Sequence, residues 1–265
     1  MNEHPEEGKN EWWKTFHVRE MADLFLDRNS KQELCETIEF LERELHLQPG
    51  DHVFDQCCGA GTLGNQLACR GYRVTGCDLC DVYLEIARSS DLLMSKDGIA
   101  IPNYVIADAF HFMPSEPCHG ALNWYSSFGY SQSDTQNVQM IQKAFDALLP
   151  NAYFALDIPN YVGLFRSFKP EMNYEGTSLG RKVLLTRRSF LDHENGLLLQ
   201  DWMWTIEGKL TETKKSALRV YLPYQICNIL EKCGFANIRI LGDVHSSQFH
   251  SDSPRLIAVA RKPTK

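Results

Sequence analysis

The sequence predicts an α/β fold in which a mainly parallel sheet is connected by crossover helices. From about residue 50 to residue 160, short apolar runs of strand length alternate with stretches of helical periodicity, and the alternation resumes after residue 223. Several connections between these runs are short, as is usual for strand–helix units. The chain has 265 residues, a length that favours one large domain or a domain with an embedded cap.

The composition is that of an ordinary globular protein with an acidic balance. Hydrophobic residues make up 43% and charged residues 23% of the chain, which argues against wholesale disorder. The net charge of −7 argues against a protein that binds nucleic acid through a basic surface. No run approaches the roughly 18 apolar residues of a membrane-spanning helix, and the acidic first residues lack the apolar core of a signal peptide. We therefore expect a cytoplasmic protein with neither nucleic acid nor membrane as a partner.

A helical segment is predicted before the first strand, from Trp12 to about Leu47. Apolar residues recur there at spacings of three and four positions, which places them on one helix face: Leu34, Ile38, Leu41 and Leu45. The run Gln48-Pro49-Gly50 then ends the helix.

Five strands are predicted to follow, with helices between them. The strands are the apolar runs His52–Phe54, Tyr72–Cys77, Tyr104–Ala107, Gly120–Tyr125 and Tyr153–Leu156. The helices are the periodic segments Asn65–Cys69, Asp81–Met94 and Asn137–Leu149. This order implies parallel strands joined by crossover connections.

The pattern changes after Pro159. Residues 160–180 are predicted to form a short helix and a loop. Strand-like runs at 182–186, 196–206 and 217–222, separated by turns, then indicate antiparallel hairpins. Trp202 and Trp204 occupy alternate positions and therefore share a face. That face could cover a substrate or pair with a second subunit, so a homodimer is one candidate assembly.

The strand–helix pattern returns near the C-terminus. Pro223–Cys233 is predicted to be a helix, with Pro in its first turn and Gly234 past its end. Strands are predicted at Asn237–Leu241 and Arg255–Ala260, and the 13 residues between them leave no room for a helix. We therefore expect these strands to be neighbours joined as a long hairpin, with the last strand antiparallel.

The most informative stretch follows the first strand. It carries Gly59-x-Gly61-x-x-Gly64, in which glycines let a ligand approach the backbone closely. Enzymes that bind dinucleotides share this pattern. Asp55, however, lies at the strand end before the glycines, where a carboxylate would repel a pyrophosphate and attract an ammonium group.

Two further acids follow the next two strands. Asp78 comes 14 residues after the last glycine of the pattern, and a carboxylate there can accept both ribose hydroxyls of an adenosine. Asp108 could accept the adenine amino group, with Phe110 against the ring. Open α/β sheets bind ligands at the carboxyl ends of their strands, where all three acids are predicted to lie.

In these residues the chain resembles the class I S-adenosylmethionine-dependent methyltransferases, in particular the soluble small-molecule branch with a Ser-Phe-Gly-Tyr stretch after the fourth strand. The resemblance covers about Gly50 to Lys262. It is carried by these segments: Asp55-x-x-x-Gly59-x-Gly61, Asp78-Leu79, Asp108-Ala109, Asn123–Tyr130, Leu156–Asn160, Cys233–Phe235 and Asp252–Leu256.

The resemblance implies a Rossmann-like, seven-stranded mixed sheet with helices on both faces, the last strand antiparallel, and a small antiparallel β cap inserted after the fifth strand. It divides the chain into an N-terminal helical lid segment (1–48), a methyltransferase core (49–160 and 223–265) and an inserted β cap or dimerisation segment (161–222). It implies S-adenosyl-L-methionine as the cofactor, bound by Asp55, Cys57, Gly59, Gly61, Asp78, Leu79, Tyr83, Asp108, Ala109, Phe110 and Asn123.

Some residues depart from the family pattern or allow another interpretation. The pair Cys57-Cys58 replaces a small residue or Leu, and Tyr83 stands where the family often has Met; its ring could still lie against the adenosine. Cys77-x-x-Cys80 has the spacing of a redox or zinc motif. No second Cys or His pair lies at zinc spacing nearby, so no metal site is predicted.

The aromatic and basic segment before the first strand is a candidate lid. Trp13, Phe16 and Arg19 would face the cofactor or substrate, and aromatic faces suit a sulfonium cation. The alternative is a helix that packs on the edge of the sheet.

Proton handling has three candidates: His17 as a general base, Tyr130 as a group that orients the acceptor, and His245. Tyr125 and Tyr130 flank the tip of the fourth strand, where acceptor and methyl group would meet.

The sequence thus predicts a methyltransferase that acts on a small-molecule acceptor, for example one of secondary metabolism, by O- or N-methylation. Transfer would be in line and would leave S-adenosylhomocysteine. The alternatives are a non-catalytic cofactor-binding or regulatory protein and a nicotinamide-dependent oxidoreductase, against which Asp55 argues.

Overall fold

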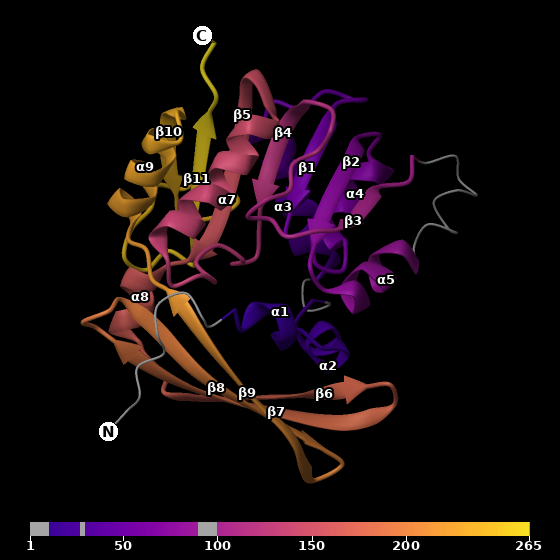
Figure 1. Ribbon diagram of the computed structural model, residues 1–265, viewed down its shortest axis with the longest axis vertical. Helices are drawn as coiled ribbons and strands as arrows, with labels where there is room; N and C mark the ends of the chain where they lie inside the picture. Colours follow the sequence, from indigo (N-terminus) through magenta and orange to yellow (C-terminus); the bar gives the residue numbers. More distant parts are fainter. Residues whose placement is uncertain (1–10, 27–29, 90–99, 265) are drawn as a thin grey trace.

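Seven strands form the larger of two sheets in the computed structural model, which describes residues 11–26, 30–89 and 100–264 (Figure 1). Their order is β10-β11-β5-β4-β1-β2-β3. The strands are β1 (His52–Gln56), β2 (Arg73–Asp78), β3 (Asn103–Ile106), β4 (Cys118–Asn123), β5 (Leu148–Pro159), β10 (Ala236–Leu241) and β11 (Arg255–Arg261). β11 runs antiparallel to both of its neighbours, β5 and β10, and the other neighbouring strands of this sheet pair in parallel. The predicted mixed sheet with an antiparallel last strand is confirmed.

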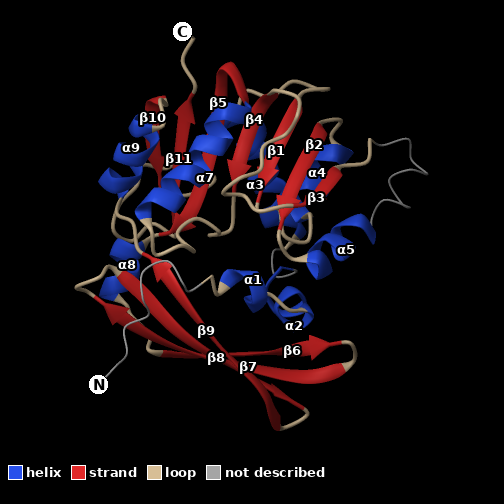
Figure 2. Ribbon diagram, in the orientation of Figure 1, coloured by secondary structure: helices blue, strands red, loops and turns tan. Residues whose placement is uncertain are grey.

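Helices cover both faces of this sheet (Figure 2). They are α3 (Lys31–Glu44), α4 (Thr62–Cys69), α5 (Asp81–Ser89), α7 (Asp134–Ala147) and α9 (Pro223–Lys232). Alternate side chains of a strand point to opposite faces. Accordingly, Val53 packs in a cluster with residues of α3 and α4, whereas Phe54 packs in a cluster with residues of α7 and α9. The last predicted residues of the helix Asp81–Met94, from 90 onward, lie outside the described residues.

The second sheet is a four-stranded antiparallel cap inserted after β5. Its strands, in the order β6-β7-β8-β9, are β6 (Glu171–Ser178), β7 (Arg181–Asp192), β8 (Leu197–Ile206) and β9 (Lys209–Arg219). The short helix α8 (Tyr161–Arg166) connects β5 to the cap. Figure 1 shows the carboxyl ends of the parallel strands facing the cap across a layer of short N-terminal helices.

The prediction of a loop up to residue 180 was wrong, because residues 171–178 form β6. Met172 and Tyr174 alternate there with the exposed residues Glu171, Asn173 and Glu175. This is the two-residue period of a strand with one covered face. Because the segment is mainly polar, this period does not stand out as an alternation of apolar and polar residues in the sequence.

The predicted helical segment from Trp12 to about Leu47 consists of several helices and not of one. The segment divides into α1 (Trp13–Phe16), α2 (Arg19–Met21), the π-helical turn η1 (Ala22–Leu26) and α3; residues 27–29 lie outside the described residues. His17 and Val18 have extended backbone conformations, which interrupt the helical hydrogen bonds. A capping box then begins α3, in which Ser30 Oγ accepts from Glu33 N at 3.1 Å and Ser30 N donates to the Glu33 carboxylate at 2.8 Å.

Within the described residues, no helix has the length and apolar character that crossing a membrane requires.

Candidate active site

One cavity of about 660 Å³ lies where the core, the N-terminal helices and the cap meet. The ends of β1, β2, β3 and β4 form its floor, α1 and its flanking residues one side, and the inner face of the cap the opposite wall. This volume lies within the usual range of small-molecule sites.

The glycine loop forms the tight turn that leaves β1. Cys57, Gly59 and Gly61 all have positive φ, at +61°, +53° and +72°, and this left-handed region favours glycine. A Cβ on Gly61 would lie 2.5 Å from Tyr104 Oη and 2.7 Å from Ala87 Cβ. Gly61 thus permits close packing beneath the loop and does not itself line the cavity.

Asp78 is held at the end of β2 by backbone donors. Its two carboxylate oxygens accept from Gly59 N at 2.9 Å and from Cys80 N at 2.8 Å. The first of these bonds ties the glycine loop to β2. Burial raises the pKa of this carboxyl group above its usual value. An ionised carboxylate has more acceptor sites than these two bonds use, so it can still bind hydroxyl groups.

Asp55 is buried at the end of β1, beside the same cavity. Parallel pairing places Asp55 opposite Gly76, two positions before Asp78. Burial, and secondly the nearby charge of Asp78, raise the pKa of Asp55 to about 7. A bound cation would favour the ionised form of this group.

The third acid, Asp108, follows β3, and its Oδ1 accepts from Phe110 N at 2.9 Å. The Phe110 ring lies edge-to-face with Trp13 of α1, with ring centroids 5.7 Å apart. The predicted residues Leu79, Tyr83 and Ala109 line the same end of the cavity. The structure therefore gathers the three acids and their predicted neighbours around one space.

Three other predicted site residues lie away from that space. Asn123 is fully buried beneath it, and its Nδ2 donates to Gln56 Oε1 at 3.1 Å. Arg19 points outward and pairs with Asp23 at 3.1 Å. His245 is exposed and lies 4.0 Å from Glu36. None of these side chains lines the cavity.

The N-terminal aromatic segment is anchored to both the core and the cap. Trp12 Nε1 donates to the carbonyls of Tyr130 and Ala217, each at 3.2 Å. Lys214 Nζ of β9 donates to the carbonyls of Thr15 and Phe16, at 2.6 Å and 3.1 Å. These carbonyls belong to the last turn of α1, where a cation is favourable.

Phe16 covers the two cap tryptophans. Its ring centroid lies 5.5 Å from that of Trp202 and 6.2 Å from that of Trp204. The shared face of these tryptophans thus packs against the chain's own N-terminal segment and toward the cavity.

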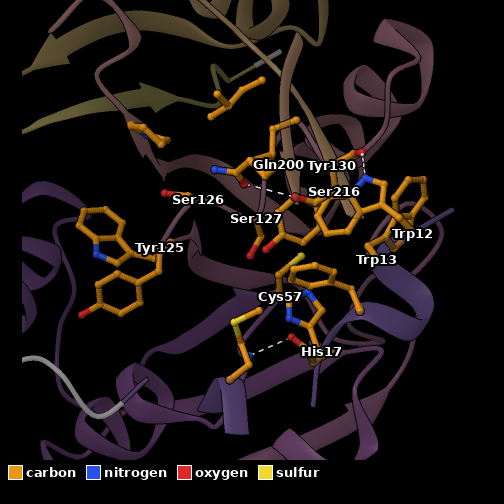
Figure 3. A pocket seen from close by; sticks show the side chains of 18 of the residues that line it. Trp12, Trp13, His17, Cys57, Tyr125, Ser126, Ser127, Tyr130, Gln200 and Ser216 are labelled. Carbon is orange, nitrogen blue, oxygen red and sulfur yellow. Dashed lines mark hydrogen bonds between the residues drawn. The ribbon is translucent and has the colours of Figure 1, made fainter. Parts of the chain in front are cut away.

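His17 and Tyr130 lie side by side in the cavity (Figure 3). Their rings are stacked with centroids 5.8 Å apart, and His17 Nδ1 lies 3.4 Å from Tyr83 Oη. Burial, and secondly the charge of Lys214, lower the pKa of His17 to about 4. Burial raises the pKa of the Tyr130 hydroxyl. At neutral pH, the imidazole is therefore uncharged and the phenol is protonated.

A strained turn follows β4 at the cavity. Tyr125 and Ser126 both have positive φ, at +59° and +73°, a conformation that costs on the order of 1–3 kcal/mol per residue. Buried Asp157 stabilises it by accepting from Tyr125 N at 3.0 Å. Arg255 donates to Asp157 Oδ1 at 2.6 Å and to Ser126 Oγ at 2.9 Å.

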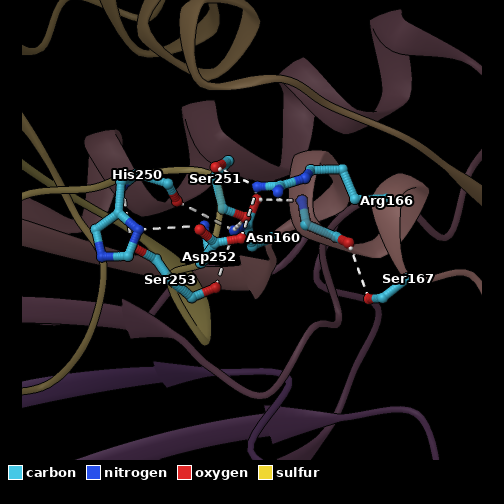
Figure 4. Close-up of polar contacts among 8 residues, drawn as sticks. Asn160, Arg166, Ser167, His250, Ser251, Asp252 and Ser253 are labelled. Atoms are coloured by element: carbon cyan, nitrogen blue, oxygen red, sulfur yellow. Dashed lines mark hydrogen bonds and ion pairs between the residues drawn. The ribbon is translucent and has the colours of Figure 1, made fainter.

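A polar network fixes the loop that precedes Arg255 (Figure 4). Asn160 Nδ2 donates to the carbonyls of Ser251 and Ser253, at 3.0 Å and 2.9 Å. Arg166 of α8 donates to Asp252 Oδ1 at 2.7 Å. These bonds join the end of β5 and α8 to the start of β11, where Arg255 enters the cavity.

The sequence analysis identified the Trp202 face of the cap but not the polar and cationic residues beside it. These residues line the cavity from the inner face of the cap: Arg187, Ser189, Gln200 and Ser216. In a strand with one covered face, polar residues normally point to solvent. Gln200, Trp202 and Trp204 occupy alternate positions of β8 and therefore share a face. The positions of the two tryptophans could thus have identified Gln200 as a residue of the covered face.

Comparisons with known proteins identify the fold. No protein-family model and no curated protein matches the sequence. An S-adenosylmethionine-dependent methyltransferase from Clostridium acetobutylicum is similar, with 14% identity, coverage of 92% of this chain and 96% of that chain, and a TM-score of 0.74. The CcbJ methyltransferase from Streptomyces caelestis has 15% identity, the same two coverages and a TM-score of 0.74. The sugar N-methyltransferase KedS8 from a Streptoalloteichus species has 14% identity, coverage of 94% and 95%, and a TM-score of 0.70. The chain has the class I S-adenosylmethionine-dependent methyltransferase fold.

Proposed function

We propose that this protein is an S-adenosylmethionine-dependent methyltransferase that methylates an oxygen or nitrogen atom of a small molecule and releases S-adenosylhomocysteine. One observation carries the proposal. Asp55, Asp78 and Asp108 end three adjacent strands and line one cavity next to the glycine loop. In a chain with this fold, that arrangement provides a separate acidic group for the ammonium group, the ribose hydroxyls and the adenine amino group of the cofactor.

The residues present fit the cofactor. Asp78, with acceptor sites to spare, would hold the ribose hydroxyls. Asp108 and Phe110 would hold the adenine, and Trp13 packs edge-to-face against Phe110. Asp55, whose raised pKa falls when a cation is near, would pair with the ammonium group.

The cofactor supplies a methyl group already activated by its positive sulfur. The contribution of the chain is alignment of the acceptor, which can supply about 7–11 kcal/mol. The uncharged imidazole of His17 can accept a proton from the acceptor, and its low pKa makes it a weak base. The protonated Tyr130 hydroxyl can donate a hydrogen bond that orients the acceptor.

We assign the acceptor to the cap side of the cavity, where the cap serves as a cover. The inner cap face with Trp202 and Trp204 is occupied by Phe16 and the cavity, which favours a covering role over dimerisation for this face. The lid function belongs to the first helices, because α3 packs into the core through Phe40 and Leu41.

Calorimetric titration tests the proposal with S-adenosylmethionine, S-adenosylhomocysteine and NAD in parallel. We expect the first two to bind and NAD not to bind. Asp78→Ala should weaken binding at least about tenfold, because it removes hydrogen bonds to a charged group. Asp146→Ala, on the outer side of α7, is the control and should bind normally.

Binding of NAD alone would contradict the proposal. Turnover with a library of small phenols and amines then separates an enzyme from a non-catalytic cofactor-binding protein.

A further inference from the structure

Buried polar side chains form part of the cap wall of the cavity. Ser189, Gln200 and Ser216 come from three adjacent strands, β7, β8 and β9, and are only 4%, 5% and 5% exposed. All three line the cavity. A buried polar group needs a hydrogen-bond partner, so the partners of these groups define what the wall can bind.

The hydrogen bonds along this wall have a fixed direction. Trp202 Nε1 lies 2.9 Å from Ser216 Oγ, and Ser216 Oγ lies 3.2 Å from Gln200 Oε1. Because an indole nitrogen can only donate, Ser216 accepts from Trp202 and gives its own proton to Gln200. Gln200 therefore turns its oxygen toward Ser216 and its NH₂ group away from it, as Figure 3 shows.

The far end of this chain of bonds presents donors. Gln200 Nε2 donates to Ser189 Oγ at 3.4 Å, a long bond. Neither the second N–H of Gln200 nor the hydroxyl proton of Ser189 meets an acceptor among the described residues. Leaving such donors unpaired in a buried site is costly. A ligand in the cavity would satisfy both donors with oxygen acceptors.

The carboxylates around the cavity lie on its core side, where the lining cation Arg255 is paired with Asp157. The described carboxylates that line it, Asp55, Asp78 and Asp108, all belong to the core side. The cap side contributes Lys169 and Arg187 and, among the described residues, no carboxylate. The guanidinium of Arg187 lies over the Trp202 ring at 5.4 Å, next to the polar chain. An ammonium group on the acceptor would meet like charge and hydrogen-bond donors there, whereas a carboxylate would meet complementary groups.

We propose that the methyl acceptor carries a carboxylate that binds Gln200 and Ser189 on the cap wall. The proposal rests on the proposed function, because it assigns the cap half of the cavity to the acceptor. It selects acids over amines as the substrate class and makes Gln200 a specificity-determining residue.

Ligand-observed NMR on the protein saturated with S-adenosylhomocysteine tests this proposal. The probes are pairs with a common skeleton: benzoate and benzylamine, phenylacetate and phenethylamine, cyclohexanecarboxylate and cyclohexylmethylamine. Phenyl phosphate is added to separate carboxylate from phosphate recognition. We expect the carboxylates to bind and their amine partners not to bind.

Two variants assign the preference to the wall. Gln200→Glu replaces the NH₂ donor by an acceptor with negative charge. This variant should bind the carboxylates about tenfold or more weakly. It should also bind the amine probes, which the wild type does not bind. Ser189→Ala should weaken carboxylate binding a few-fold and leave the amines excluded. Gln66→Glu introduces the same change on the exposed side of α4 and should bind as wild type.

Several outcomes would overturn the inference: equal binding within the pairs, preference for the amines, preference for phenyl phosphate, no binding of any probe, or an unchanged preference in Gln200→Glu. Saturation with S-adenosylhomocysteine is verified first by calorimetry. If that cofactor product does not bind, the proposed function fails; if it binds and the carboxylates do not, only the present inference fails.

Discussion

The charge of Asp55 depends on what occupies the cavity. Its carboxyl group has a pKa of about 7 because it is buried near Asp78. An acid whose pKa is raised in the folded protein makes its full contribution to stability below its usual pKa of 3.8, where the folded and the unfolded chain both hold the proton. This contribution falls as the pH rises from 3.8 to about 7, because the unfolded chain gives up the proton more readily, and a bound cation would offset the loss.

The affinity for S-adenosylmethionine should therefore fall as the pH is lowered through about 7. Below that pH, the ammonium group must displace a proton from Asp55, and the cost approaches tenfold in affinity per pH unit. Calorimetry in two buffers of different ionisation enthalpy, from pH 6 to 8, measures both the affinity and the proton release.

Asp55→Asn serves as the comparison for this measurement. It should bind more weakly throughout and lose the pH dependence. The same pH dependence in the variant would show that another group titrates.

At the residue scale, the three acids could be predicted because each follows a recognisable strand and precedes a loop. Gly61 and Asn123 show the limit of such reasoning. A motif identifies Gly61, but only the structure shows that Tyr104 and Ala87 leave no space for a Cβ. Asn123 lies one residue before Trp124, where the lining of the cavity begins, and its partner Gln56 lies on the paired strand β1, 67 positions away in the sequence.

At the scale of elements, Lys214 holds α1 in place. It is the only described side chain that donates to the last carbonyls of α1, and its side chain is 15% exposed. We predict that Lys214→Met weakens binding of S-adenosylhomocysteine several-fold, mainly through faster dissociation, because the lid opens more often. Stopped-flow fluorescence of the N-terminal tryptophans measures the dissociation rate.

The neighbouring residue Lys215 is a matched control. Its side chain is 80% exposed and points away from the lid toward Asp201. Lys215→Met should behave as wild type. Equal dissociation rates in both variants would show that Lys214 does not retain the lid.

The elements themselves were largely predictable, because the core strands are short apolar runs between turns. The break in the predicted helical segment at His17 and Val18 was not foreseen, because tertiary contacts override a helical period there. Trp12 and Lys214 bind partners more than a hundred residues away, and the extended backbone at His17 and Val18 accommodates them. No local pattern encodes such contacts.

At the scale of the whole molecule, one cavity couples the core, the lid and the cap. The order of the core strands follows from chain connectivity and could be predicted, but the placement of the cap over the cavity depends on packing between distant segments. Because Trp12 bonds to both Tyr130 and Ala217, a ligand that fixes the lid also fixes the cap.

Hydrogen exchange should reveal this coupling. S-adenosylhomocysteine should slow exchange in α1 and β9 as well as in the glycine loop. In Trp12→Leu, which lacks the indole donor, protection should remain in the glycine loop and be lost from α1 and β9. Full protection of α1 and β9 in this variant would contradict the coupling.

The anchoring of the lid also has a consequence for the order of folding during synthesis. Trp12 and Ala217 are 205 positions apart, and Lys214 is 199 positions from Thr15. The aromatic segment leaves the ribosome long before its partners on β9. Because such distant contacts form late, the lid packs in place only after the core and the cap have formed. Trp12, Trp13 and Phe16 stay exposed to solvent until then. The closed cavity thus forms only after β9 has been made, and chaperones that bind apolar segments have a long opportunity to bind the aromatic segment before that.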